Sequence, residues 1–147
     1  MLGHSKPWLY LSTYFERYKD EYYDNLFRIS THGDWTKWVE FCLHGTIQRA
    51  NNAIRTCRKI NELREEYHSI TSDNPSPRTH QIVEQLFNSP LVTIPSVAKH
   101  CSTSYHTARS DINRLIELGI LFELTDSRPK NFFAKKLFNV AYVSSDF

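Results

Sequence analysis

Residues 94–119 read IPSVAKHCSTSYHTARSDINRLIELG, and this stretch decides the fold of the second half of the chain. Pro95 suits the first turn of a helix through residue 100, because a proline there loses no intrahelical hydrogen bond. The Ser-Thr pair at 102–103 is suited to capping a second helix over 104–118, and Gly119 can end it. Two short helices joined by a three-residue turn are typical of a helix-turn-helix.

The flanking segments extend this motif. A short helix is predicted over 79–88, followed by a β-like run over 91–94. After the motif, 120–124 is predicted to be a strand, 126–131 a polar turn, and 132–138 the returning strand. Helix, strand, helix, turn, helix and hairpin follow one another in the order of a winged helix-turn-helix.

The second helix of the motif has two chemically different faces. At about 100° per residue, its apolar residues share one arc. His106, Ser110 and Asn113 lie opposite this arc, and Arg109 and Arg114 lie on its two flanks. Arg and Asn can make bidentate contacts to guanine and adenine in the major groove, so these five residues are candidate DNA contacts.

The predicted hairpin supplies further candidate contacts to DNA phosphates. They are the basic residues of its tip and return strand: Arg128, Lys130, Lys135 and Lys136. Two alternatives stay open, because a charged hairpin can also dock on protein or be plain solvated surface. Asp111 and Glu117 also offset the two helix arginines in a count of charge.

The chain divides at its proline-rich segment, which stops a helix and is typical of a linker. We expect a helical region over 1–72, a linker over 73–78 and a winged helix-turn-helix domain over 79–147. In the first region, 14–30 is predicted to be one helix ended by Gly33. The fold class is therefore mainly α, with two long helices in the first half and a small β-hairpin in the second.

The second of these long helices, from Trp35 to about Ile70, carries an apolar stripe in steps of three and four. Gly45 within it indicates a kink or a close helix contact. The stripe exceeds what two helices can cover, so we expect a homodimer. Aromatic residues are dense before and within this region, and they are typical of a core. Tyr22 and Tyr23 are the reserve candidates for a ligand contact.

The composition limits the class of function. The charge of +2 over 147 residues excludes a uniformly basic surface, so any DNA binding must use a local patch. The start of the chain lacks the pattern of a secretion signal, no apolar run is long enough for a membrane span, and three scattered cysteines fit the reducing cytoplasm. The His and Cys spacing predicts no metal site, and no motif indicates a cofactor or catalysis.

Three motifs in the first 41 residues are similar to the C-terminal portion of Fic-family proteins. They are Lys6–Ser12 (KPWLYLS), Asp20–Leu26 (DEYYDNL) and Gly33–Phe41 (GDWTKWVEF). This resemblance implies a helical region, a long helix and a winged helix closing the chain. It also implies that Tyr22 and Tyr23 approach the adenine of a nucleotide when a catalytic core is joined.

Family members transfer AMP to protein hydroxyls with the motif His-x-Phe-x-(Asp/Glu)-Gly-Asn-x-Arg, which is absent from this sequence. The resemblance therefore implies a non-catalytic regulatory part of a Fic-like protein, whose winged helix binds double-stranded DNA. The alternative is a protein-interaction and dimerisation module of a Fic-type enzyme that needs the missing core.

Overall fold

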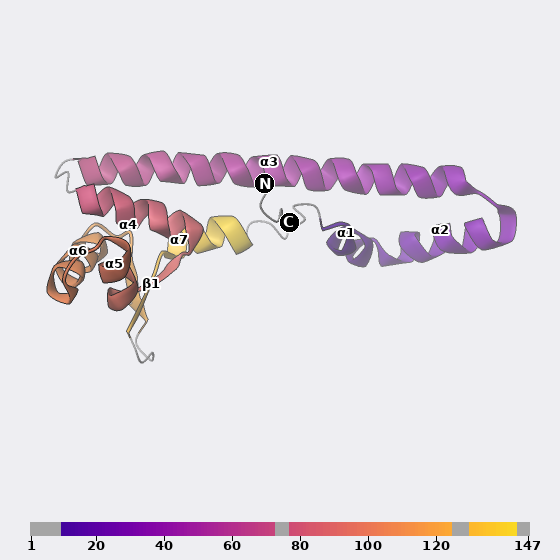
Figure 1. The fold of residues 1–147 in the computed structure, drawn as a ribbon. Coiled ribbons are helices and arrows are strands. Elements are labelled where there is room, and N and C mark those ends of the chain that lie inside the picture. The colour runs from indigo at the N-terminus through magenta and orange to yellow at the C-terminus, as the bar shows by residue number, and fades with distance from the viewer. Residues whose placement is uncertain (1–9, 73–76, 125–129, 144–147) are drawn as a thin grey trace. The chain divides into compact units, whose positions relative to one another are not determined.

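The computed structural model describes residues 10–72, 77–124 and 130–143. The described elements are mainly α-helical, with one small three-stranded antiparallel sheet, which confirms the predicted fold class (Figure 1). The chain forms two compact units, the first ending at Cys57 and the second beginning at Arg58. Among the described residues, no helix is both long and apolar enough to cross a membrane.

The first unit contains α1 (Leu11–Arg17), α2 (Lys19–His32) and the beginning of α3 (Trp35–Ser72). The prediction of one helix over 14–30 is wrong, because the backbone leaves the helical region at Tyr18 (φ −110°, ψ 44°) and starts again. The predicted stop at Gly33 is confirmed: its φ of +66° is the left-handed conformation that glycine adopts without strain.

Aromatic rings hold the three helices of this unit together. The Tyr14 ring lies 5.1 Å from the Phe41 ring, and the Phe15 and Phe41 rings stack at 5.7 Å between centroids. Gly45 lies against Tyr14, since a Cβ atom at position 45 would be only 2.5 Å from the tyrosine ring. The glycine therefore marks a close helix contact, as its position in the sequence predicts.

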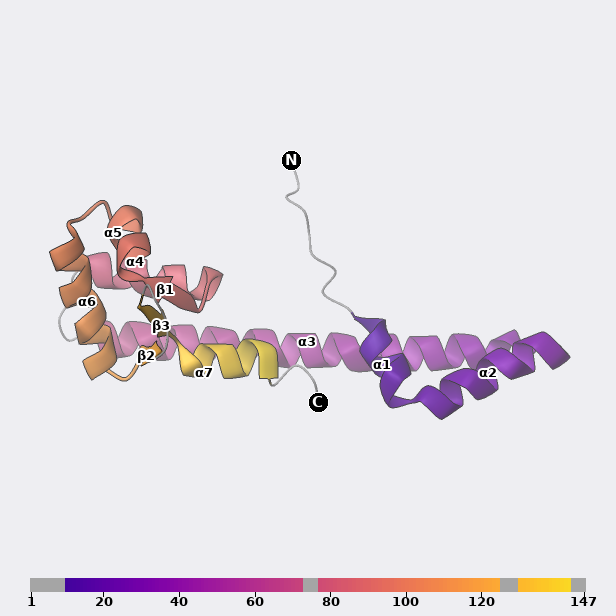
Figure 2. The ribbon, with the colours of Figure 1, turned by 90° about the horizontal axis from the view of Figure 1, so that it is seen from below.

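The second unit begins with the C-terminal part of α3 and contains every strand described. Figure 2 shows its helices arranged around the sheet. Its elements are α4 (Pro77–Asn88), β1 (Leu91–Thr93), α5 (Ile94–His100), α6 (Tyr105–Glu117), β2 (Phe122–Leu124), β3 (Asn131–Phe133), α7 (Lys135–Phe138) and a π-helix, Asn139–Val143.

The hydrophobic core of this unit is closed on all sides by its helices and sheet. Its side chains with no exposed surface come from α4, α5, α6, the segment before β2 and the residue after β3, and Tyr67 of α3 packs against them. They are Ile82, Val83, Leu86, Val97, Ala108, Ile112, Leu115, Leu121 and Ala134. A core of this kind needs no further partner.

The sheet has the order β1-β3-β2, and both pairs are antiparallel. The predicted return strand over 132–138 is too long: β3 ends at Phe133, and α7 follows. The chain turns at Ala134 (φ −86°, ψ 83°), whose N–H donates to the carbonyl of Pro90 at 2.9 Å. This hydrogen bond holds the end of the strand against the segment before β1.

Residues 73–76 of the predicted linker lie outside the described residues. Pro77 and Arg78, which complete that linker, belong to the first turn of α4. The division into domains at 73–78 stays a prediction.

Candidate nucleic-acid interface

The turn between α5 and α6 is fixed by backbone hydrogen bonds. The N–H of Cys101 donates to Val97 at 2.9 Å, and the N–H of Thr103 donates to Ala98 at 2.9 Å. Ser102 has a φ of +49°, the left-handed conformation that lets the chain reverse in few residues. The predicted turn at 101–103 therefore exists and joins two helices that pack on each other.

Side-chain caps set where the two helices begin. Thr93 and Ser96 form a reciprocal capping box at α5. At α6 the cap is Ser104, whose hydroxyl accepts from the N–H of Thr107 at 3.2 Å. The capping assigned to Ser102 and Thr103 is wrong, because both belong to the turn and Ser104 is the first residue positioned to cap.

Helix α6 turns its candidate DNA contacts away from the core. Ala108, Ile112 and Leu115 are fully buried. On the other side of the helix, Arg114 is half-buried at the edge. The other four candidates are exposed: His106, Arg109, Ser110 and Asn113. The structure thus brings all five candidates on α6 to one polar surface.

Asp111 does not belong to this surface, contrary to what a count of charge suggests. Its side chain is buried against α4 and accepts a hydrogen bond from Arg78 Nε at 2.9 Å. This bond raises the pKa of Arg78 above its usual range. Since Asp111 is paired inside the unit, Glu117 is the remaining acidic residue on the exposed face of α6.

The candidate phosphate contacts outside α6 differ in whether they already pair with an acidic residue. Lys130 pairs with Glu123 of β2, and Lys136 pairs with Glu66 of α3 at 2.8 Å. Lys135 is exposed at the start of α7. Arg128 lies outside the described residues. Exposed ion pairs contribute little energy, so a phosphate can compete for either lysine.

Tyr105 is a surface residue of α6 that is not among the candidate contacts predicted from the sequence. It is 56% exposed at the first position of α6 and precedes Arg109 by one helical turn. The spacing of four residues between Tyr105 and the candidate contact Arg109 is the sequence signal that identifies Tyr105 as a further candidate. Its ring offers an apolar contact of the kind that suits a thymine methyl group.

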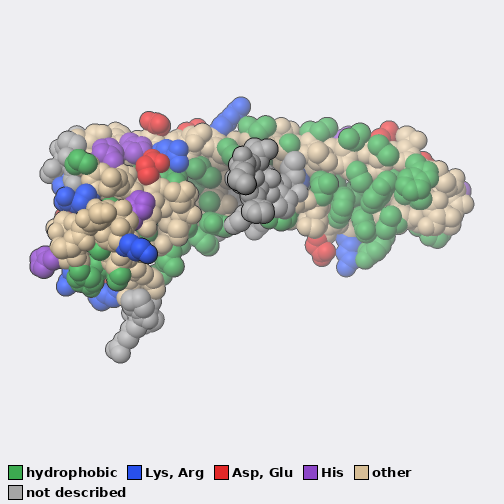
Figure 3. All heavy atoms as spheres, in the orientation of Figure 1, with side chains coloured by type: hydrophobic (Ala, Val, Ile, Leu, Met, Phe, Trp, Pro, Cys, Tyr) green, Lys and Arg blue, Asp and Glu red, His purple; other side chains and the backbone are tan. Residues whose placement is uncertain are grey.

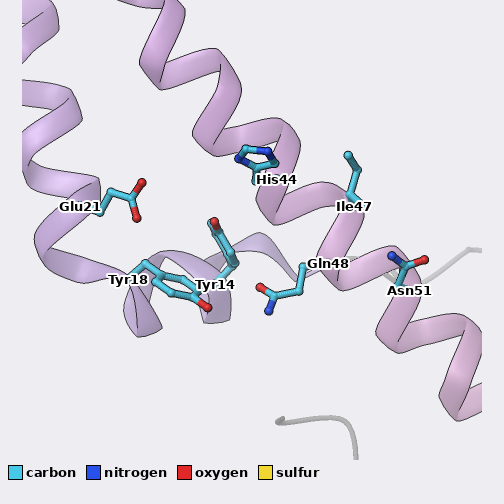
Figure 4. Close-up of a pocket in the computed structure, with 7 residues that line it drawn as sticks. All are labelled: Tyr14, Tyr18, Glu21, His44, Ile47, Gln48 and Asn51. Atoms are coloured by element: carbon cyan, nitrogen blue, oxygen red, sulfur yellow. The ribbon is translucent and has the colours of Figure 1, made fainter.

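The first unit has a hollow of about 490 Å³ beside α3. Figure 4 shows that side chains from α1, the junction at Tyr18, α2 and α3 surround it. The lining residues are Tyr14, Tyr18, Glu21, His44, Ile47, Gln48 and Asn51. The two tyrosines considered for nucleotide contact do not line it: the Tyr22 ring packs on Trp38 at 5.7 Å, and the Tyr23 ring packs edge-on against Tyr22.

The described histidines and cysteines form no metal-binding cluster, and two of the three cysteines are partly buried. In the part of the chain that the structure describes, no group of three His, Cys, Asp or Glu side chains could hold a metal ion. Burial raises the pKa of Cys42 and of Cys101 above the usual thiol range. Both sulfurs therefore stay protonated and weakly nucleophilic at neutral pH.

Comparison with known families identifies residues 78–124 as similar to a DeoR-like helix-turn-helix domain. The matched segment begins in α4 and ends with β2, so it includes α5, the turn and α6. This match supports a DNA-binding regulatory role for the chain.

The same comparison gives no Fic-family match, and the resemblance based on residues 6–41 is wrong. Residues 6–9 of that stretch lie outside the described residues. Phe15, Tyr22 and Trp38 pack on one another within the helices of the first unit. Packing of this kind accounts for the rings without a catalytic partner, and the adenine contact assigned to Tyr22 and Tyr23 loses its support.

Proposed function

We propose that this chain is a DNA-binding regulator that inserts α6 into the major groove of double-stranded DNA. The observation that carries the proposal is the polar face of α6, which lies opposite the buried face within a helix-turn-helix. Helices of this motif present such a face to base edges. The proposal implies a compartment in which the protein meets DNA, such as the cytoplasm.

The residues of α6 divide by chemistry into two roles. Asn113 lies near the centre of the exposed face and suits bidentate contact with adenine, while Arg109 suits guanine. His106 and Ser110 can donate to or accept from neighbouring bases. Arg114, at the edge of the face, suits a phosphate.

Further phosphate contacts are assigned to the basic residues around the hairpin, which are Arg128, Lys130, Lys135 and Lys136. These contacts position the protein without reading sequence. A minimum of about four phosphate contacts predicts binding that weakens steeply with salt.

In the first experiment, preferred duplexes are selected from a randomised pool. Fluorescence anisotropy at low salt then measures the affinity of the protein for a selected duplex and for a random-sequence duplex. We expect Asn113→Ala to reduce the preference for the selected duplex over the random one by about 1–3 kcal/mol. Arg55→Ala, which changes a residue of the first unit, serves as the control and should preserve the preference.

Absence of duplex binding below about 100 µM at low salt would contradict the proposal, since even non-specific binders reach this affinity. That result would favour the other hypothesis for the hairpin, in which the winged unit docks on a protein partner.

A further inference from the structure

Helix α3 carries an apolar stripe that the first unit leaves uncovered. Between positions 35 and 57, ten residues fall within an arc of about 120° on the helix, and none of them is charged. Its five large side chains are between 49% and 62% exposed: Trp35, Val39, Leu43, Ile47 and Ile54. Figure 3 shows hydrophobic side chains gathered on the first unit, in the region of α1, α2 and the beginning of α3.

Apart from Ile47, which also lines the hollow beside α1 and α2, the stripe is separate from the side of α3 that packs within the unit. Phe41 and Gly45 face Tyr14, and both lie roughly half a turn away from the stripe. The uncovered stripe is therefore a second apolar face of the same helix.

The exposed area is suited to a partner of limited size. Five large side chains about half exposed, with the small residues between them, amount to on the order of 600 Å² per copy. Two copies would bury about 1,200 Å² in total, the lower end of the range for stable protein interfaces.

The distribution of side-chain size indicates how a second copy fits. The first half of the stripe contributes Trp35, Val39 and Leu43. The second half has the small residues Ala50, Ala53 and Cys57 along its centre, with Ile47 and Ile54 along one edge. In an antiparallel pair, the large residues of one copy face the small residues of the other. A parallel pair would set large against large and leave gaps between the alanines, which costs packing.

We infer that this stripe is a self-association surface, occupied by the stripe of a second copy in the antiparallel direction, with the two-fold axis near Thr46. The inference gives the expected homodimer a defined interface, and it does not depend on DNA binding. A two-fold dimer also presents two copies of α6, as paired half-sites in DNA require.

The first test is the mass of the full chain by light scattering at tens of micromolar. We expect twice 17.3 kDa for the native sequence. Leu43→Glu should give the monomer mass, because it places a charge on the stripe. Lys37→Glu adds the same side chain off the stripe, and it should leave the dimer intact. A monomeric native chain would overturn the inference.

A second readout needs no variant that risks misfolding. Cys57 is exposed on the stripe in the single chain. Its reaction with a thiol reagent should therefore slow by tenfold or more as the protein concentration passes the dissociation constant. An unchanged rate from nanomolar to tens of micromolar concentration would also overturn the inference.

Oxidative cross-linking tests the direction of pairing. Two antiparallel copies place their Cys57 residues about 33 Å apart, from about 1.5 Å per helical residue, far beyond disulfide range. Thr46→Cys should give a covalent dimer on mild oxidation, whereas the native chain and Lys37→Cys should not. A covalent dimer of the native chain that is lost in Cys57→Ser would show parallel pairing and contradict the arrangement.

The two proposals fail in different measurements. A dimer that binds no duplex would contradict the DNA proposal alone, and a monomer that binds duplex would contradict the self-association surface alone.

Discussion

The two units use similar amphipathic helices but bury them to very different extents. In the second unit, side chains from α4, α5 and α6 meet in one core and lose all exposure. In the first unit, Tyr14 and Phe41 are the buried large apolar residues among those described, while a whole stripe of α3 remains exposed. The same periodicity in sequence therefore gives a closed core in one unit and an uncovered face in the other.

The two units differ in burial because their apolar faces are covered by neighbouring elements from different numbers of sides. The second unit surrounds its core with helices that cross one another and with a sheet. In the first unit, α1 and α2 contact one side of α3, which leaves the opposite side open. A helical pattern alone shows that a face is apolar, but it does not show which partner buries it.

The largest expected effect comes from the closed core. Leu115→Ala should lower the free energy of unfolding by about 2–5 kcal/mol, because it removes buried contacts and leaves a cavity. Leu43→Ala, on the exposed stripe, should cost less than about 1 kcal/mol at a concentration too low for association. Urea unfolding followed by circular dichroism measures both, and equal costs would break the contrast between the units.

An intermediate effect is expected inside the first unit. Gly45→Ala should destabilise its helices by about 1–3 kcal/mol, since the added methyl group meets the Tyr14 ring and the ring is held by Phe41. Thermal melting of helicity tests this. The double variant Tyr14→Ala/Gly45→Ala should show no additional cost of the alanine at 45 over Tyr14→Ala alone. A stabilising Gly45→Ala would show that the close contact is absent.

A smaller effect is expected at Tyr67 of the second unit. Its hydroxyl is buried without a hydrogen-bond partner among the residues described, so Tyr67→Phe should raise stability by up to about 1 kcal/mol. Burial, and secondarily the charge of Glu66, raises the pKa of this hydroxyl to about 12.

The raised pKa also gives Tyr67 a pH signature. The folded state holds the proton more tightly than the unfolded state, whose tyrosine pKa is about 10. The contribution of Tyr67 to stability is therefore complete below pH 10 and is lost as the pH rises toward 12. Between pH 10 and pH 12, the free energy of unfolding should fall less steeply with pH in Tyr67→Phe than in the native chain. An unchanged pH dependence would contradict the buried hydroxyl.

Local signals made much of the fold predictable. Pro95 fixes its own φ, whereas Gly33 and Gly119 allow the positive φ that follows a helix end, and the observed helix boundaries agree with them. The break at Tyr18 and the end of β3 at Phe133 carry no such residue. The end of β3 depends on a distant part of the chain through the hydrogen bond from Ala134 to Pro90, and nothing in the sequence explains the break at Tyr18.

The orientation of α6 was predictable from the spacing of its apolar residues, but the balance of charge on its exposed face was not. The spacing of Ala108, Ile112 and Leu115 is sufficient to orient α6. The removal of Asp111 from the exposed face is not visible in the sequence, because its partner Arg78 lies 33 residues earlier. The aromatic motifs of the first unit were misleading, because their described rings, such as Tyr22 and Trp38, pack on each other inside the unit.

The most direct test of the central claim is the salt dependence of duplex binding by the native chain and by Arg109→Ala, with Arg55→Ala as the charge-matched control. We predict a log–log slope near −4 for the native chain and the control, at about −0.9 per phosphate contact, and weaker binding by Arg109→Ala. Indistinguishable affinity and slope in all three proteins would contradict the assignment of α6 as the DNA-reading helix.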